Sequence, residues 1–385
     1  MTNTAGRTTR HDGAATAAAT PLPAASGLPG QVVLVLQGGG ALGAYQAGVF
    51  EALHQAGVEP DWVIGTSIGA INAALIAGNA PEQRLQALQA FWRGVEQRQP
   101  AAGALAALGL ANLMPNLATM ARGIPGFFQP NPQVWRGVHA ELGVEQAAYY
   151  STEPLRDTLQ ALVDFDRIAS GAMRLTVGAV NANTGAMRYF DSRHQRLDVA
   201  HVMASGALPP AFPAVRIDGE PYWDGGIYSN TPIEAVLDDK PRRDSLIFTV
   251  NVWHQSGPEP GSISQVMSRQ KDIQFASRAD SHIERQKQIH RLRHVIQQLA
   301  GELPAALKDD AHIRELASWG CRTTMHVAHL VAPRLPGEDS SKDIDFTPAG
   351  IRARHEAGVA DTRDLLQRAP WRATPDPIEG VVEYR

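Results

Sequence analysis

The stretch QVVLVLQGGGALGAY, residues 31–45, decides the fold class of this chain. Its first six residues, 31–36, form an apolar run rich in valine, which is typical of a buried strand in a parallel sheet. A glycine loop follows, and residues 44–57 then place apolar side chains near helical spacing. A short strand at 61–65 and a helix of small residues at 70–78 repeat this order. The alternation of strands and helices predicts an α/β fold with a mostly parallel sheet.

Length and composition bound the class of protein. The chain has 385 residues, enough for one large domain or two ordinary ones. With 44% hydrophobic and 19% charged residues it can bury a sizeable core. Its formal net charge is −4, so no global field points to nucleic acid as a partner. Cys321 is the only cysteine, which rules out an intrachain disulfide and suits a reducing compartment.

The N-terminal residues do not have the pattern of a secretory signal. Residues 1–30 are rich in Ala, Thr, Gly and Pro and contain no apolar core segment, so we expect a disordered leader. The longest apolar run, residues 101–114, is shorter than the roughly 20 residues that span a bilayer. We therefore expect a cytoplasmic protein, with peripheral attachment to a membrane as an open option.

Further strands and another helix follow the first two units. Segments that read as strands are 173–181, 187–191, 215–226 as a hairpin, 244–253, and 323–333 as an edge strand. Residues 347–366 begin with Thr followed by Pro, which is typical of a helix N-terminus. The last fifteen residues have no clear pattern.

The glycine loop admits three interpretations. The spacing of Gly38, Gly40 and Gly43 satisfies the G-x-G-x-x-G pattern of dinucleotide-binding loops. A dinucleotide site also needs an acidic residue at the end of the second strand, whereas Asp61 stands at the start of that strand. The second interpretation is an anion site in which the amides of Gly38, Gly39 and Gly40 hold a transient oxyanion. The third is a tight turn without a ligand.

The pentapeptide Gly65-Thr66-Ser67-Ile68-Gly69 has the form G-x-S-x-G and lies between a predicted strand and a predicted helix. In this position it predicts a nucleophile elbow, a strained turn that exposes the hydroxyl of Ser67. Gly65 and Gly69 lack side chains, so the turn can close and a substrate can approach. A serine that transfers acyl groups needs backbone donors for the oxyanion of its intermediate. The elbow therefore favours the oxyanion interpretation of the glycine loop.

A nucleophilic serine also needs a base, and two residues are candidates. Asp224 lies between a predicted strand and two glycines, although carboxylates at such turns often bond only their own backbone. His254 follows the strand at 244–253 and is the natural histidine in the chain order Ser, Asp, His. The residues alone leave this choice open.

Three blocks of sequence together resemble the patatin-like phospholipase family. They are LVLQGGGALGAYQAGVFEAL at 34–53, GTSIGAINAAL at 65–75 and DGGIYSNTPI at 224–233, in the order that the family has them. The resemblance implies a three-layer α/β/α fold with a mostly parallel central sheet. It also implies hydrolysis of acyl esters of lipids.

The same resemblance assigns residues to roles. It implies a Ser–Asp dyad without a histidine, in which Ser67 matches the nucleophile and Asp224 the base. Gly38, Gly39 and Gly40 match the family's oxyanion loop, and His254 becomes a spectator. One position departs from the family, whose members commonly have Arg or Lys where this chain has Leu42. The substrate headgroup is therefore open, and a neutral ester, a lysolipid or another acyl compound fits the pattern.

Two segments outside these blocks are candidates for contact with lipid. Residues 100–135 carry one charge and end in aromatic residues, which indicates either an apolar cap beside the site or buried helices packed on the sheet. Residues 281–303 predict a basic amphipathic helix with Ile289, Leu292, Ile296 and Leu299 on its apolar face. A solvated helix that covers the core is the favoured interpretation, and a helix lying on an anionic membrane is the alternative.

We therefore expect a serine acyl hydrolase with a leader at 1–30, a catalytic domain at 31–260 and a C-terminal extension at 261–385. That extension is expected to be helical with one strand. The expected partner is a lipid or another acyl ester, and neither a cofactor nor a metal is needed, because no metal-binding spacing occurs in the sequence. Alternatives are an acyltransferase or thioesterase on the same dyad, a nucleotide-binding protein, and a non-catalytic lipid-binding protein.

Overall fold

The computed structural model of the chain describes residues 27–97, 122–276 and 279–385. Its centre is a nine-stranded sheet with the order β11-β10-β9-β1-β2-β5-β8-β7, in which β6 also pairs with β5. The strands are β1 (Gln31–Leu36), β2 (Trp62–Thr66), β5 (Arg174–Asn181), β6 (Met187–Asp191), β7 (Val215–Ile217), β8 (Glu220–Asp224), β9 (Ser245–Asn251), β10 (Met325–Val331) and β11 (Val381–Tyr384). From β11 to β5 all neighbours are parallel, whereas β6, β7 and β8 pair antiparallel. The predicted α/β class with a mostly parallel sheet is confirmed.

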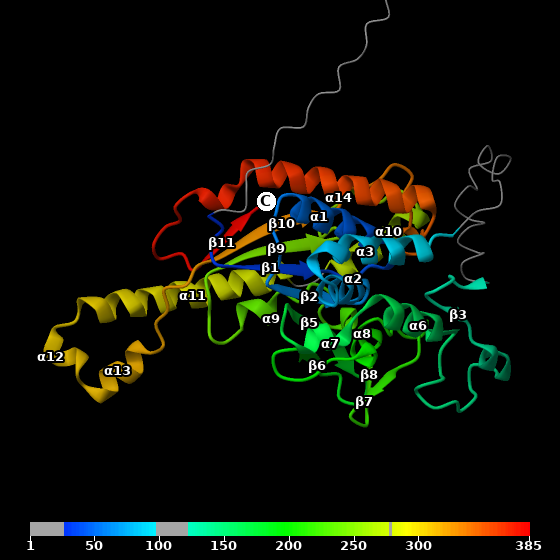
Figure 1. Cartoon of the computed structure of the whole chain (residues 1–385), viewed down its shortest axis with the longest axis horizontal. Coiled ribbons are helices and arrows are strands. Elements are labelled where there is room, and N and C mark those ends of the chain that lie inside the picture. Colours follow the sequence, from blue (N-terminus) through cyan, green and yellow to red (C-terminus); the bar gives the residue numbers. More distant parts are fainter. Residues whose placement is uncertain (1–26, 98–121, 277–278) are drawn as a thin grey trace, which may run out of the picture.

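The apolar run of β1 is buried on both faces of this sheet. Val32, Leu34 and Leu36 belong to one core, and Val33 and Val35 to another, because successive side chains of a strand point to opposite faces. The first core includes α1, α2, α3 and α14, and the second includes α9 and α11. Figure 1 shows helices on both sides of the strands, which gives the expected three layers.

The described helices are named as in Figure 1. They are α1 (Ala44–Gln55), α2 (Ile68–Ala77), α3 (Arg84–Gly94), α6 (Glu153–Leu162), α7 (Phe165–Ala169), α8 (Val199–Ser205), α9 (Glu234–Leu237), α10 (Ile263–Phe275), α11 (Ala279–Glu302), α12 (Ala305–Lys308), α13 (Ala311–Ala317) and α14 (Pro348–Arg368). A separate two-stranded antiparallel sheet is formed by β3 (Gln129–Pro130) and β4 (Tyr150–Ser151). None of the described helices has both the length and the apolar character that crossing a membrane requires.

Strand β5 determines where the loops of the candidate site meet. One edge of β5 pairs with β6 from Thr176 to Val180. The other edge pairs first with β2, up to Thr66 opposite Gly178, and then with β8, where Asp224 stands opposite Ala179. Because β2 runs parallel and β8 antiparallel to β5, these two strands point their C-terminal ends at each other. The residues that follow β2 and those that end β8 are therefore neighbours.

The C-terminal part of the chain extends the same sheet. Residues 325–331 form β10 as an inner strand between β9 and β11, so the prediction of an edge strand there was wrong. The edge is β11, in the last fifteen residues, where no pattern predicts a strand. Strand β11 has four residues and pairs on one side, with β10. Such a short edge strand can form without a regular alternation of apolar and polar residues.

Helix α11 buries a different face from the predicted one. Leu292 is 64% exposed and Leu299 is 63% exposed, so the predicted apolar line does not cover the core. The buried residues are instead Ile283, Gln286, His290 and His294. Burial lowers the pKa of His290 to about 4, so this histidine enters the interior as a neutral ring. In Figure 1, α12 and α13 lie at the end of α11 that is remote from the sheet.

Two predicted segments fall wholly or partly outside the described residues. Of the leader at 1–30, residues 1–26 are not described, and of the apolar segment at 100–135 the described part begins at Arg122.

The predicted helix at 347–366 is confirmed as α14, and the Thr347 side chain accepts a hydrogen bond from the Gly350 amide at 3.1 Å.

Glycines allow α1 and α14 to pack backbone to backbone. A Cβ atom at Gly48 would lie 2.0 Å from the carbonyl oxygen of His355, and one at Gly358 would lie 2.2 Å from the carbonyl oxygen of Tyr45. The Tyr45 hydroxyl also donates to Asp361 at 2.8 Å. Because α1 starts directly after the glycine loop, this contact fixes one side of the candidate site.

We predict that Gly48→Ala destabilises the fold by about 1–3 kcal/mol, because the added methyl group forces two helix backbones apart. Thermal and urea unfolding followed by circular dichroism measure this change. Gly94→Ala is the matched control, since Gly94 ends α3 and a Cβ atom there would have no described neighbour within 4 Å. Equal stability of the Gly48 variant and wild type would contradict the close packing of α1 on α14.

Candidate active site

Ser67 occupies a strained turn between β2 and α2. Its backbone angles are φ 57° and ψ −128°, a region that non-glycine residues rarely enter. A Cβ at Gly65 would lie 2.3 Å from backbone atoms of Gly69, so the turn closes only with glycine there. The Ser67 amide donates to the carbonyl and the hydroxyl oxygens of Ser205, both at 3.1 Å. These contacts hold the predicted elbow in its strained conformation.

Asp224 meets Ser67 at the junction of β2 and β8. The carboxyl group is buried, with 1% of the residue exposed, and Oδ1 accepts the Gly226 amide at 2.7 Å. Burial raises the pKa of Asp224 to about 7, although hydrogen bonds from the Ser67 hydroxyl and the Gly226 amide lower it. A carboxylate with this pKa is a stronger base than an exposed one, and the hydroxyl that needs activation lies next to it.

The glycine loop passes over Ser67. A Cβ at Gly38 would lie 2.9 Å from Cβ of Ser67. The Gly38 amide is already engaged, because it donates to the carbonyl oxygen of Asn230 at 3.1 Å. The amides of Gly39 and Gly40 have no acceptor within the part of the chain that the structure describes. Among the three predicted glycines, the last two are therefore the ones with a backbone donor to offer.

The same geometry argues against a dinucleotide at this loop. Gly40 has φ +55°, and a Cβ there would lie 2.2 Å from the carbonyl oxygen of Asp343, an acceptor that repels a phosphate. The Asp61 carboxylate accepts the Val32 amide at 2.8 Å, at the end of the parallel sheet opposite the loop. It is therefore not placed to hold a ribose.

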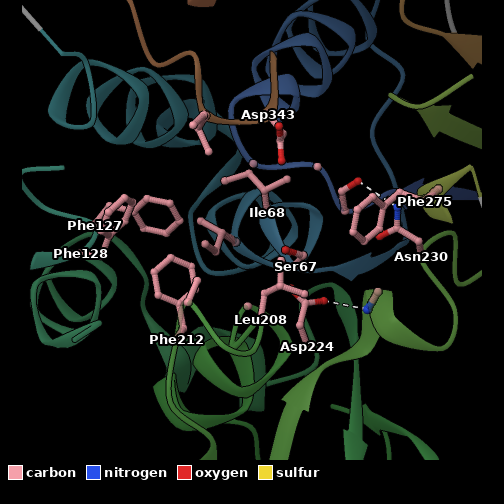
Figure 2. Close-up of a pocket in the computed structure, with 18 of the residues that line it drawn as sticks. Ser67, Ile68, Phe127, Phe128, Leu208, Phe212, Asp224, Asn230, Phe275 and Asp343 are labelled. Carbon is pink, nitrogen blue, oxygen red and sulfur yellow. Dashed lines mark hydrogen bonds between the residues drawn. The ribbon is translucent and has the colours of Figure 1, made fainter. Parts of the chain in front are cut away.

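A cavity of about 260 Å³ opens above Ser67 and Asp224 (Figure 2). Its lining is mainly apolar and comes from distant parts of the chain: Ile68, Ile71, Phe127, Phe128, Tyr150, Leu208, Phe212, Phe275, Ile344 and Phe346. Phe128 and Phe212 are in ring contact, with centroids 5.2 Å apart. No Lys, Arg or His lines this cavity among the residues described. The site therefore suits an uncharged, apolar group next to the serine.

His254 lies outside this cavity. It lines a separate pocket of about 340 Å³, together with residues of β9 and β10. Burial, together with the nearby cations Arg334 and Lys342, lowers its pKa to about 4. Asp224, and not His254, is the candidate base that the fold brings to Ser67.

The sequence patterns do not predict the side chains that hold the glycine loop. Gln37 is fully buried, and its Oε1 accepts the amides of Val252 and Trp253 at 2.6 and 2.9 Å. Asn230 and Trp253 both donate to the carbonyl oxygen of Gly38, at 3.1 and 2.8 Å. Asn230 lies within the third family block, so a signal for it existed, whereas nothing near Trp253 marks it in the sequence.

No cluster of three or more His, Cys, Asp or Glu side chains that could hold a metal occurs within residues 27–97, 122–276 and 279–385. Besides Asp224, the described cavity wall includes the carboxylate residue Asp343, which forms an ion pair with Lys271 at 2.7 Å. The wall thus offers neither a metal-ligand set nor an unpaired charge among the described residues.

The raised pKa of Asp224 predicts how the stability of the fold changes with pH. The folded state holds this proton more tightly than the unfolded chain, whose carboxyl has a pKa near 3.8. The free energy of unfolding therefore falls as pH rises from about 4 to about 7, and stays reduced above that range. Asp224→Asn removes the buried charge, so its Tm should exceed that of wild type at pH 8.5, with the difference shrinking at pH 5.

The control for this measurement is Asp239→Asn. Although burial raises the pKa of Asp239, its bonds with Arg174 hold that pKa below the ordinary value, so this variant should lower Tm at pH 8.5. A Tm of Asp224→Asn below that of wild type at pH 8.5 would contradict the prediction that the buried, charged carboxylate destabilises the fold.

Two family models match this chain. The model described as "Patatin-like phospholipase" matches residues 34–237, more than half of the chain, and one described as "Patatin phospholipase" matches residues 273–378. The first match contains the glycine loop, the elbow and Asp224. The second contains the C-terminal residues that line the cavity wall, among them Ile344 and Phe346.

Curated relatives and solved structures are similar to the chain over different lengths. A "cGAMP-activated phospholipase" of Pseudomonas aeruginosa is 27% identical over 242 residues, which are 58% of this chain and 62% of that protein. "Lysophospholipase nte1" of Aspergillus terreus is 57% identical over 49 residues, 13% of this chain and 3% of that protein. The chain thus spans less than two thirds of either relative.

Among solved structures, VipD from Legionella pneumophila has a TM-score of 0.37 at 15% identity, covering 88% of this chain and 67% of that one. Because this family's model matches residues 34–237, more than half of the chain, the chain belongs to the patatin-like phospholipase family.

Proposed function

We propose that this protein is a serine acyl hydrolase that cleaves carboxylic esters of lipids through a Ser67–Asp224 dyad. The observation that carries the proposal is the placement of Ser67 beside the buried carboxyl of Asp224, where the ends of β2 and β8 meet at the wall of an apolar cavity. Family membership supports the same class of reaction. The two relatives are named as phospholipases of different kinds, which agrees with an acyl substrate and leaves its headgroup open.

In the first half of the reaction, Ser67 Oγ attacks the ester carbonyl carbon while Asp224 takes the hydroxyl proton. The carbonyl oxygen becomes an oxyanion, and the amides of Gly39 and Gly40 donate to it. The positive end of α2, which starts at Ile68, adds a favourable field. When the tetrahedral intermediate collapses, the C–O bond to the alcohol breaks and Asp224 returns its proton to the leaving oxygen.

In the second half, water attacks the acyl-enzyme and Asp224 takes a proton from that water. A second oxyanion forms on the same donors. Its collapse breaks the bond to Ser67 Oγ, which recovers the proton, and the fatty acid leaves. Each proton that Asp224 accepts is given back, so the dyad ends the cycle unchanged.

The cavity wall supports a lipid acyl chain as the group bound beside the serine. Phe127, Phe128, Phe212 and Phe346 offer apolar surface, and the described lining has no cation for a phosphate. The headgroup is then left at the mouth of the cavity, where a peripheral contact with a lipid surface would deliver the substrate. Residues 31–260 supply the dyad, and residues 261–385 supply part of the wall.

We predict that Ser67→Ala and Asp224→Asn each lower kcat for p-nitrophenyl esters by at least about 1,000-fold while the fold is kept. An amide at position 224 cannot accept the serine proton. His254→Ala, the control outside the cavity, should stay within about threefold of wild type. If Ser67 is the nucleophile, a fluorophosphonate probe should label the wild type and should not label Ser67→Ala. An active Asp224→Asn with an inactive His254→Ala would overturn the dyad.

The pH dependence of kcat separates the two bases in a second way. Asp224 must be deprotonated to act, so activity should rise with pH through a midpoint near 7, the pKa to which burial raises this carboxyl. If His254 were the base, the midpoint would lie near 4, because burial lowers its pKa to that value. A rate profile between pH 3.5 and 9 measures the midpoint, and a limb near 4 would contradict the Asp224 assignment.

Acyl transfer and thioester hydrolysis use the same acyl-enzyme. Assays with an acyl-CoA and with a lysolipid acceptor, run beside ester hydrolysis on wild type and Ser67→Ala, decide which acceptor and which leaving group the site prefers. A protein that binds lipid vesicles but shows neither turnover nor probe labelling would be a non-catalytic binder instead.

A further inference from the structure

The peptide unit between Gly38 and Gly39 is held by two buried side chains. Its carbonyl oxygen, that of Gly38, accepts Nε1 of Trp253 at 2.8 Å and Nδ2 of Asn230 at 3.1 Å. Trp253 and Asn230 are each 4% exposed, and both line the cavity of the dyad. Figure 2 shows Asn230 beside the loop, with its bond as a dashed line. Two buried donors on one carbonyl oxygen fix its direction.

The direction of this carbonyl also sets the direction of the Gly39 amide. A peptide unit is planar and trans, so its N–H points opposite to its C=O. The Gly39 N–H therefore points away from Trp253 and Asn230, and no described residue accepts it. Gly39 itself lines the same cavity as Ser67. Hydrogen bonds accepted by the carbonyl further polarise the N–H of the same peptide unit and make it a stronger donor.

We propose that Trp253 and Asn230 are positioning residues that aim the Gly39 amide at the oxyanion. This inference rests on the proposed function and adds to it two side chains whose described hydrogen bonds go to backbone carbonyl oxygens, and to neither the nucleophile nor the base. Asn230 holds the loop at two points, because its backbone carbonyl oxygen also accepts the Gly38 amide at 3.1 Å. The Gly38 amide thereby serves the loop's geometry, and the Gly39 amide is left for the substrate.

Both the backbone and the ring of Trp253 are fixed by contacts. Its backbone amide donates to Oε1 of Gln37 at 2.9 Å. Its ring contacts Phe275, with centroids 5.2 Å apart, and the ammonium of Lys342 lies 5.1 Å from the ring centroid. Lys342 is paired at 2.6 Å with Asp272, and both side chains are at least 95% buried. Residues from the C-terminal part of the chain thus carry the constraint to the glycine loop.

The experiment compares Trp253→Phe with wild type and with Trp62→Phe. Phenylalanine keeps an aromatic ring in the Trp253 site but removes the N–H donor. Trp62 is the matched control, since its buried indole also donates one hydrogen bond, to Thr176 at 2.9 Å, at the far end of β2. We expect kcat to fall about 10-fold in Trp253→Phe with KM within about twofold, and to stay at the wild-type value in Trp62→Phe.

A transition-state analogue separates positioning from a general loss of structure. An alkyl trifluoromethyl ketone forms a tetrahedral adduct with the serine, and its oxygen occupies the oxyanion position. Its inhibition constant should rise by the same factor as kcat/KM falls in Trp253→Phe. The double variant Trp253→Phe/Asn230→Ala should lose more than the product of the single losses, because each donor compensates for the absence of the other.

The results that overturn the inference are distinct from those that overturn the proposed function. An active wild type with unchanged kcat in Trp253→Phe, an unchanged inhibition constant, or an equal loss in Trp62→Phe would each refute the positioning role alone. A wild type without ester turnover or probe labelling would refute the proposed function, and the inference with it.

Discussion

Strand β5 holds two other strands end to end along one edge, and this arrangement determines the candidate site. The hydrogen-bond register places Thr66 of β2 opposite Gly178 and Asp224 of β8 opposite Ala179. Ser67 and Asp224 are far apart in sequence, yet the sheet brings them to adjacent places on one strand. A slip of β8 by one residue would turn the carboxyl to the other face of the sheet. The sheet register, rather than a flexible loop, therefore sets their separation.

Burying a carboxyl group at this junction has opposite consequences for stability and for chemistry. Removal from water disfavours the charged form, which raises the pKa of Asp224 to about 7 and lowers the stability of the fold above that pH. The same shift makes the group a better acceptor for a serine proton. The strained backbone of Ser67 follows the same principle, because Ser205, Gly65 and Gly69 must hold a conformation that an isolated chain would avoid.

The C-terminal part of the chain belongs to the structure of the site. Strands β10 and β11 extend the central sheet, and α14 packs on α1 through Gly48 and Gly358. The carbonyl of Asp343 lies against Gly40, and Ile344 and Phe346 form part of the cavity wall. The glycine loop is therefore enclosed by segments from both ends of the described chain. This explains why sequence blocks confined to residues 34–233 describe the dyad but not the walls around it.

Local patterns in the sequence were sufficient for the features that form within a few residues. The strand at 31–36, the elbow around Ser67 and the N-terminus of the helix after Thr347 each depend on contiguous residues, so periodicity and turn chemistry predict them. Asp224 was one of two candidates from the residues alone, and only the family resemblance favoured it over His254.

Tertiary structure decided what depends on residues far apart in the chain. Gly38 is bonded to Asn230 and Trp253, which are 192 and 215 positions away, so no local pattern shows that its amide and its carbonyl oxygen are both engaged. The buried face of α11 was likewise decided by its neighbours, because the helix offers both an apolar line and a line that contains two histidines, and the residues of the second line are the buried ones. Short-range patterning selects an element, whereas burial and hydrogen bonding between distant segments select which of its groups are used.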